Sequence, residues 1–335
     1  MKKEFKNIVG IDVSKKTIDA GLLVNEADAT ILKKKFSNNI KGYKALNSWM
    51  KENNAGLKDT LFCLENTGIY HRLLTGWLLQ QQAFVWAETP VQIKWSMGIQ
   101  RGKSDPVDAG RICTYAFRNQ DKAVLYSQTN KTVQKIADLL ALRKRLLDNI
   151  KTLKVPVKEL KDTGLKEAAK LVEASCKKSI VTMEKEVQKV EEKIQQLIDA
   201  DPELAKKYKY ASSVRCVGFT AVVTLIVYTN GFQRFDNAKQ LASYCGIAPF
   251  EYSSGTSIKG KTKVHPMANK TLKTAMHMCS VSAVRHNEEM KTYFIRKVAE
   301  GKNKMSVLNA VRNKLIHRVF ACIRDEKEYS LKKAA

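Results

Sequence analysis

Four acidic residues in the first third of the chain have the type and setting that a metal-dependent nuclease site requires: Asp12, Glu65, Asp105 and Asp108. Asp12 follows the apolar run 8–11, and Glu65 ends a second run at 61–64, so each carboxylate is predicted at the exit of a buried strand. Crowded carboxylates repel one another unless a cation neutralises them, and hard cations such as Mg²⁺ take oxygen ligands. In a chain with a net charge of +26, this set predicts a metal site that acts on phosphodiesters.

The remaining two acids share a short motif, KSDPVD at 103–108. Proline after Asp105 suits the first turn of a helix, and a spacing of three places Asp105 and Asp108 on one helical face. Each acid also has an ordinary structural interpretation. Asp105 can cap the helix, Asp108 can interact with its dipole, Asp12 can cap a turn, and Glu65 begins the turn-like sequence ENTG. The four together favour the metal.

The basic composition indicates the class of partner. The 335 residues contain 59 Lys and Arg against 33 Asp and Glu, with a pI near 9.7. Such an excess favours polyanions, chiefly nucleic acid, over a membrane surface, for which no anchor is evident. No run of about 18 apolar residues and no signal peptide is evident, and the seven cysteines form no Cys-x-x-Cys pair. We therefore expect a cytoplasmic protein with reduced thiols and no zinc site.

The first predicted domain, 1–128, alternates strand-like and helix-like segments. Strands are expected at 7–13, 18–24, 30–36, 60–65 and 83–87, and helices at 41–53, 70–82 and 106–119. Strands that first pair as hairpins and then alternate with helices predict a mixed α/β sheet. Its strand ends would bring the carboxylates together at one edge.

The second predicted domain, 129–208, is a helical coiled-coil spacer. A helix is expected over 136–153, with Pro156 breaking it. Apolar residues then follow a heptad spacing, which predicts a second long helix: Ile180, Met183, Val187, Val190, Ile194 and Leu197. The two helices would fold as a hairpin or pair with a partner chain.

The third predicted domain, 209–335, is mainly helical and the most basic, with 22 Lys and Arg against 8 Asp and Glu. Its sequence VRCVGFT at 214–220 resembles a helix-hairpin-helix element, in which a glycine turn, here Gly218, presents backbone N–H groups to a phosphate. No acidic residue lies between Glu251 and Glu288. The lysines of this stretch predict a basic loop that tracks a phosphate backbone: Lys259, Lys261, Lys263, Lys270 and Lys273.

Five motifs in this order resemble the insertion-sequence one-ten transposases, the group that includes Piv-type invertases. They are GIDVSK at 10–15, ENTG at 65–68, KSDPVDA at 103–109, LASYCGIAP at 241–249 and YSSG at 252–255. The resemblance implies an α/β RuvC-like (RNase H-like) mixed-sheet domain, the helical spacer, and a mainly α-helical C-terminal transposase domain. The chain departs from the family where it has Ala268-Asn269 and Leu272-Lys273 in place of Gly-Asn and Leu-Arg. Lysine keeps the charge but loses the bidentate fork of arginine.

The resemblance further implies a DNA recombinase that works with Mg²⁺ or Mn²⁺ at the four acids. Ser254, preferred over Ser253 because it precedes glycine, would attack the phosphodiester and form a covalent phosphoserine intermediate. The implied partners are donor and target double-stranded DNA, a structured non-coding bridge RNA that guides them, and further copies of the chain in a dimer or tetramer. The implied location is the bacterial cytoplasm, at the nucleoid. Nucleic-acid contacts are expected at Lys103, Arg111, Gly218, Gly255, Lys259, Lys261, Lys263, Lys270 and Lys273.

Two other function classes remain open on the sequence. A RuvC-type structure-selective endonuclease would use metal-activated water and would not need Ser254. A non-catalytic nucleic-acid-binding protein would tolerate Asp12→Asn without change, although the four acids argue against it.

Overall fold

The chain folds into two compact units, Met1–Gln128 and Thr129–Ala335. The computed structural model describes residues 5–24, 30–66, 68–98, 105–126, 130–254, 258–264 and 268–330, and over 250–263 it describes the backbone alone. No helix within these ranges has both the length and the apolar character that crossing a membrane requires.

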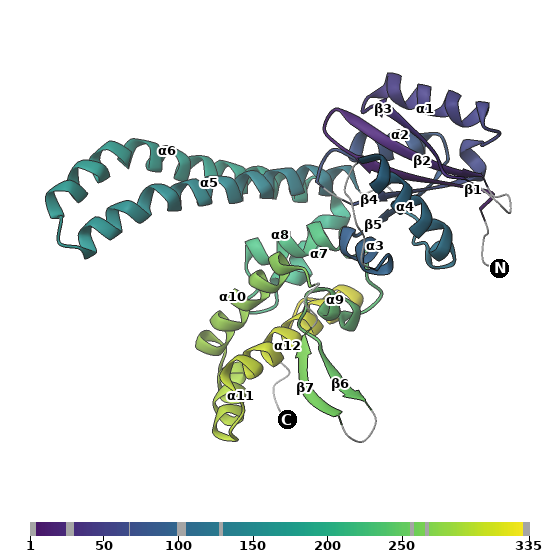
Figure 1. Cartoon of the computed structure of the whole chain (residues 1–335). Helices are drawn as coiled ribbons and strands as arrows, with labels where there is room; N and C mark the ends of the chain where they lie inside the picture. Colours follow the sequence, from purple (N-terminus) through teal and green to yellow (C-terminus); the bar gives the residue numbers. More distant parts are fainter. Residues whose placement is uncertain are drawn as a thin grey trace. The chain divides into compact units, whose positions relative to one another are not determined.

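The first unit is built on a five-stranded mixed sheet, shown in Figure 1. Its strands are β1 (Asn7–Val13), β2 (Thr17–Val24), β3 (Leu32–Ser37), β4 (Thr60–Glu65) and β5 (Phe84–Glu88), in the spatial order β3-β2-β1-β4-β5. The first three strands are antiparallel, whereas β4 and β5 run parallel to β1. The prediction of a mixed sheet with hairpin-paired strands first is confirmed.

Helices cover both faces of this sheet. One face packs against α1 (Ile40–Glu52) and α2 (Arg72–Gln80), through a core that includes Ile11, Tyr43 and Leu78. The other face packs against α3 (Pro90–Ser96) and α4 (Asp105–Asn119), through a second core with Cys63 and Ile112. Because both faces are covered, β1, β2 and β4 are almost continuously buried, which explains why their sequences are mostly apolar. Two short 3₁₀ turns, Leu57–Asp59 and Gln120–Lys122, and helix α3 were not predicted.

The second unit begins with a long antiparallel helix pair, α5 (Lys131–Asp162) and α6 (Lys166–Asp199). The predicted heptad positions of α6 face the pair or the core beyond it, since Val187, Val190 and Ile194 are buried. The predicted break at Pro156 is wrong, because α5 continues through it. Pro156 is exposed while the following Val157 is buried, so packing along the pair outweighs the one backbone hydrogen bond that proline removes.

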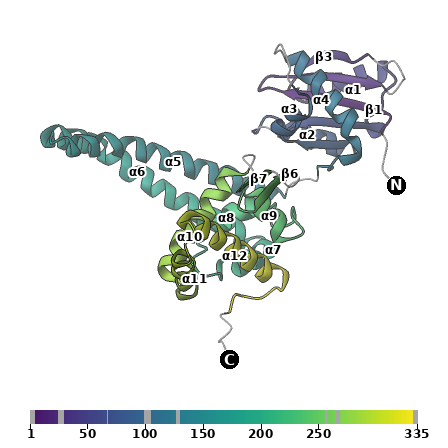
Figure 2. The ribbon, with the colours of Figure 1, turned by 60° about the horizontal axis from the view of Figure 1, so that its bottom comes forward.

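Helices and one β-hairpin complete the second unit, as Figure 2 shows. The elements are α7 (Pro202–Ser212), α8 (Phe219–Tyr228), α9 (Ala238–Tyr244), β6 (Pro249–Ser254), β7 (Ile258–Val264), α10 (Lys270–His286), α11 (Glu288–Ala299) and α12 (Lys304–Arg324). The predicted loop around the serines and basic residues is instead this antiparallel hairpin, with Ser253 opposite Lys259 and Ser254 opposite Ile258. The sequence of β7 alternates apolar or small residues with lysine, a period that suits a strand.

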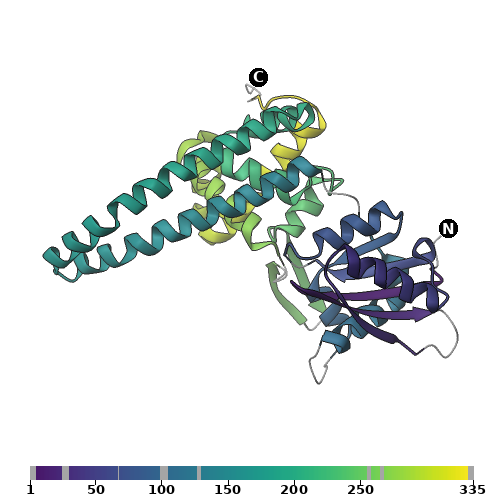
Figure 3. The ribbon, with the colours of Figure 1, turned by 90° about the horizontal axis from the view of Figure 1, so that it is seen from above.

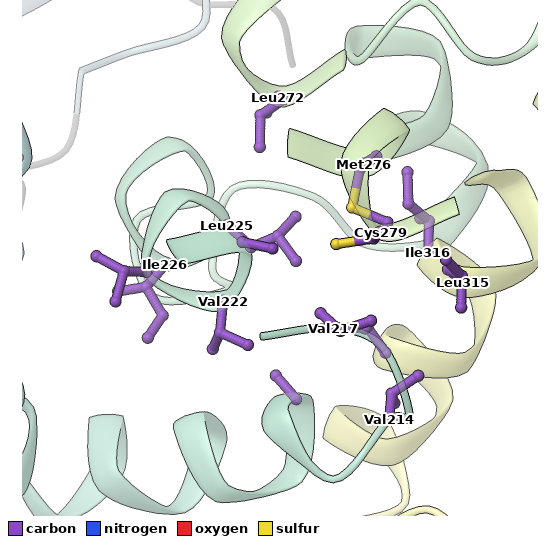
Figure 4. Close-up of a cluster of buried hydrophobic side chains, with 14 of the residues drawn as sticks. Val214, Val217, Val222, Leu225, Ile226, Leu272, Met276, Cys279, Leu315 and Ile316 are labelled. Carbon is purple, nitrogen blue, oxygen red and sulfur yellow. The ribbon is translucent and has the colours of Figure 1, made fainter. Parts of the chain in front are cut away.

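One hydrophobic core joins the helix pair to the rest of this unit. Figure 3 shows α5 and α6 lying side by side with their near ends against the other helices. Val133 of α5 and Ile194 of α6 share a core with the buried side chains of α8, α10 and α12. The close-up of Figure 4 shows Leu225 of α8 pointing towards Met276 and Cys279 of α10, with Val222 of α8 in the same cluster. The end of the spacer is therefore anchored in the C-terminal region.

The seat of α4 on β1 gives a stability prediction. A Cβ added at Gly10 would lie 2.1 Å from the backbone N of Cys113, a contact that only backbone movement can relieve. We expect Gly10→Ala to lower the free energy of unfolding by about 3 kcal/mol or more in urea denaturation. Gly76→Ala is the matched control, because a Cβ at this α2 position meets nothing within 4 Å. That variant should be as stable as wild type or gain about 1 kcal/mol, since alanine favours helix. Equal losses in the two variants would contradict this account.

Candidate functional site

A row of charged side chains crosses the sheet at one level. Asp12 of β1 pairs with Asp19 of β2, which pairs with Lys35 of β3. On the other side, Glu65 of β4 pairs with Glu88 of β5. Leu64 is the register partner of Ile11, so Glu65 and Asp12 are the next residues along two parallel strands. Register partners and alternate residues project from the same face of a sheet, so these five residues share a face.

Helix α4 lies over this face because glycine lets its backbone approach. Gly10, two residues before Asp12, has no side chain to separate β1 from Ala109 and Cys113. Gly21 of β2 makes a similar approach, with its Cβ position 3.1 Å from the Ala109 carbonyl oxygen. The first turn of α4, which carries Asp105 and Asp108, is therefore brought to the row of charges.

Three of the predicted acids interact electrostatically. Burial raises the pKa of Asp12, and the negative charges of Asp105 and Asp108 raise it further. Asp19 adds to the same effect, whereas a backbone hydrogen bond from Val13 lowers this pKa. About 90 residues of sequence separate Asp12 from the other two acids, so only the fold could bring their charges together.

Two basic side chains lie among these carboxylates. The Lys35 ammonium Nζ is 3.4 Å from Asp19 Oδ2 and 3.9 Å from Asp105 Oδ2. The Arg111 guanidinium donates a 2.8 Å hydrogen bond from Nη1 to Asp108 Oδ1, one turn along α4. Arg111, predicted to contact nucleic acid, thus has a carboxylate partner within the site.

The far end of the row is held differently. Glu88 accepts hydrogen bonds from the backbone N of Thr89 and from the Tyr115 hydroxyl of α4. Burial raises the pKa of Tyr115, and the neighbouring Glu88 carboxylate raises it further. Glu65 and Glu88 both raise the pKa of the buried Cys63 thiol, after the larger effect of burial. Glu65 is the register partner of Glu88 and alternates with Cys63 along β4, so it lies on the α3 and α4 side of the sheet with the rest of the row.

The acids suit a hard divalent cation by donor chemistry, because they are carboxylates whose mutual repulsion a cation would relieve. Across the described ranges, however, no three Asp, Glu, His or Cys side chains converge closely enough to hold one ion. Lys35 and Arg111 engage Asp105 and Asp108 instead. The carboxylates therefore have the donor chemistry that a metal requires, but here two of them contact the basic side chains Lys35 and Arg111.

The β6–β7 hairpin that carries the candidate serines is fixed at its base. Asn309 of α12 donates a 2.6 Å hydrogen bond from Nδ2 to the Ile247 carbonyl oxygen, two residues before β6. After β7, the backbone N of Asn269 donates to the Tyr244 carbonyl oxygen, and its side chain donates to the Tyr244 hydroxyl. Both ends of the hairpin are therefore tied to the helical core.

Two predicted nucleic-acid contacts come together in one groove of about 960 Å³. Gly218, which precedes α8, and Lys270, which begins α10, both line it, together with Lys144 of α5. A Cβ at Gly218 would meet nothing within 4 Å, and its φ of −83° is ordinary, so packing does not require glycine here. The open space in front of the α8 amino end fits the predicted contact with a phosphate.

The other predicted contacts are placed only in part. Lys273 lies on the second turn of α10, half-buried, and the strand β7 carries Lys259, Lys261 and Lys263. Ser253 and Ser254 occupy the end of β6. Lys103 and Gly255 lie outside the described residues.

Sequence reasoning missed three members of the charged row: Asp19, Lys35 and Glu88. Each sits in a segment correctly predicted as a strand or at its end. The signal was the hairpin register, because pairing Asp12 with Asp19 follows once the turn between β1 and β2 is placed at 14–16.

Comparison with known proteins identifies the family. The chain matches the family described as Transposase IS116/IS110/IS902 over residues 208–294, and the IS110 DEDD transposase over residues 9–161. The chain belongs to this transposase family. It is therefore a DNA recombination enzyme, and a DEDD domain of this family implies metal-dependent catalysis.

The relatives include proteins of nearly the same length. Pilin gene-inverting proteins of Moraxella bovis and Moraxella lacunata are each 25% identical over 329 residues, which span 97% of this chain and 98% of theirs. An uncharacterized 43.6 kDa protein of insertion element IS110 from Streptomyces coelicolor is 30% identical over 159 residues, covering 48% of this chain and 38% of that protein. Among solved structures, Thermus thermophilus RuvC is 12% identical with a TM-score of 0.28, and covers 36% of this chain and 99% of that one.

The coupling at Asp12 predicts a pH-dependent stability. Its pKa in the folded chain is raised above the ordinary 3.8, so ionisation of Asp12 destabilises the fold as the pH rises through the interval between the two values. Without divalent cations, we expect Asp12→Asn to melt at a higher temperature than wild type at pH 7. The difference should shrink as the pH falls towards 3.8. Calorimetry across this range is the measurement, and a variant less stable than wild type at every pH would contradict the expectation.

Proposed function

We propose that this transposase is a site-specific recombinase that cuts and rejoins the DNA of an insertion sequence through a covalent serine intermediate. The observation that carries the proposal is the close packing of α4 on β1, which brings Asp105 and Asp108 to the face of the sheet that carries Asp12. This placement puts carboxylate chemistry suited to phosphoryl transfer in a family that recombines DNA.

Asp12, Glu65, Asp105 and Asp108 are the proposed holders of Mg²⁺ or Mn²⁺. When bound, such an ion lowers the pKa of an attacking hydroxyl and stabilises charge on the transferred phosphoryl group. The chain's own contribution is to hold the oxygen ligands. Asp12 comes from a buried strand, while Asp105 and Asp108 come from a helix seated on that strand.

Ser254 is the proposed nucleophile. A serine hydroxyl is a weak nucleophile at neutral pH and requires activation, so the proposal requires that it meet the carboxylates of its own or another subunit. Support comes from the position of Ser254 at the last residue of β6, next to the hairpin turn. The ties from Asn309 and Asn269 at the hairpin base would hold that strand in a defined direction.

The groove lined by Gly218 and Lys270, together with the lysines of β7, is the proposed surface for the DNA backbone. Backbone N–H groups at the start of α8 and the ammonium of Lys270 supply complementary charge for a phosphate. The excess of Lys and Arg in this region supports contacts with long polyanions, 22 against 8 acidic residues over 209–335.

A structured guide RNA and assembly into a dimer or tetramer complete the proposal. The net charge of +26 suits more than one nucleic acid, and the exposed apolar residues of the α5–α6 pair, such as Leu171 and Val181, suit contact with a second chain. Copurification of a discrete RNA, and the mass of the complex with and without it, test these two parts.

The nucleophile is tested by two neighbouring serines. With DNA carrying the element's ends and Mg²⁺, we expect Ser254→Ala to abolish the covalent protein–DNA adduct and to lower strand transfer by about 10³-fold or more. Ser253→Ala is the matched control, because it removes the same hydroxyl from the neighbouring residue of β6. Mass spectrometry of the trapped adduct identifies the modified residue. Cleavage by Ser254→Ala at the wild-type rate would favour a hydrolytic, RuvC-type endonuclease. Full activity of Asp12→Asn would exclude metal chemistry at the acids.

The groove is tested by salt-dependent DNA binding. Each lysine that contacts a phosphate contributes about one unit to the slope of log K against log salt. We expect Lys144→Gln with Lys270→Gln to weaken binding and to reduce this slope by about one to two units in fluorescence anisotropy. Lys206→Gln, an exposed lysine of α7 that does not line the groove, is the control. An unchanged slope in the double variant would place the DNA elsewhere.

A further inference from the structure

Lys35 connects two parts of the candidate metal site that are remote in sequence. It lies on β3, the edge strand of the sheet, and its ammonium is within 4 Å of both Asp19 and Asp105. Lys33, two residues earlier, lies against Gly110 of α4, so this side of β3 faces the helix. Lys35 thus links the sheet edge to the first turn of α4.

Asp19 is the carboxylate that most needs the positive charge of Lys35. It is 4% exposed, it is the register partner of Asp12, and its charge raises the pKa of Asp12. A carboxylate buried to this degree is costly unless a cation lies beside it. Lys35 supplies that cation from a side chain that is 52% exposed.

We propose that Lys35 is a positioning residue that occupies Asp105 in the free site, where it competes with a metal ion, and releases Asp105 when the ion arrives. The inference rests on the proposed function, since it assumes that Asp12 and Asp105 hold the ion. Lys35 balances part of the negative charge of the free site. A divalent cation then competes with the ammonium for Asp105.

The two contacts of Lys35 differ in a way that fits this exchange. The contact with buried Asp19 is the shorter, at 3.4 Å, and the contact with exposed Asp105 is the longer, at 3.9 Å. Charge pairs close to solvent are weakened by water, so the outer contact is the easier one to break. Lys35 can therefore leave Asp105 while it continues to neutralise Asp19, and the buried carboxylate never loses its cation.

The exchange predicts that Lys35 lowers the affinity of the free site for metal. We expect the full-length chain with Lys35→Met to bind Mn²⁺ about five-fold more tightly than wild type, measured by electron paramagnetic resonance of free Mn²⁺. Lys35→Arg keeps the charge and should bind as wild type does. Lys34→Met is the matched control, because Lys34 lies on the opposite face, over the Phe36 ring. In Asp19→Asn, Asp105 is the remaining carboxylate partner of Lys35, so the ammonium competes more strongly with the ion. This variant should bind Mn²⁺ more weakly than wild type by a similar factor.

A double-variant comparison separates this role from a general effect on folding. In an Asp105→Asn background the exchange has no partner, so Lys35→Met should no longer tighten Mn²⁺ binding. If wild type binds Mn²⁺, Asp12→Asn does not, and Lys35→Met binds equally or more weakly than wild type, the positioning role is overturned while the metal site stands. If neither wild type nor any variant binds Mn²⁺, the proposed metal site fails and the role of Lys35 fails with it.

Discussion

The close approach of α4 to β1 at Gly10 is the constraint on which the candidate site depends. A side chain at this position would collide with the backbone of Ala109 and Cys113, so the helix could not lie as close to the sheet. Protein interiors are packed too densely for such a collision to be absorbed without movement of the helix. Asp105 and Asp108 precede this contact by about one turn, and the same displacement would move them away from Asp12. A glycine thus sets the positions of three carboxylates.

Negative charge is concentrated near this contact, and basic side chains of the same site neutralise part of it. The row from Lys35 to Glu88 crosses all five strands at one level, with a basic residue at one end and a hydrogen-bonded carboxylate at the other. Repulsion among the central acids is retained, as the raised pKa of Asp12 indicates. The second unit carries most of the chain's excess positive charge.

Much of this organisation was predictable because it depends on local patterns. Continuous apolar runs predicted β1 and β4, heptad spacing predicted α6, and Pro106 predicted the start of α4 within one residue. The error at Pro156 has the opposite cause, since packing between two long helices outweighed a local preference. The β6–β7 hairpin was missed because its strands are short and polar, with serines and lysines that are also typical of loops.

The sequence by itself determined the residue types of the site, the order of the elements and the family, because motifs and periodicities are properties of neighbouring residues. The tertiary structure alone decided which charges meet. Strand register placed Asp19 and Lys35 in the site, and the helical spacing of α4 placed Arg111 within hydrogen-bond distance of Asp108. Gly218 and Lys270 line the same groove because α8 and α10 begin close to each other. Electrostatic interactions depend on distance in space, and that distance is fixed only once the sheet and helices have packed.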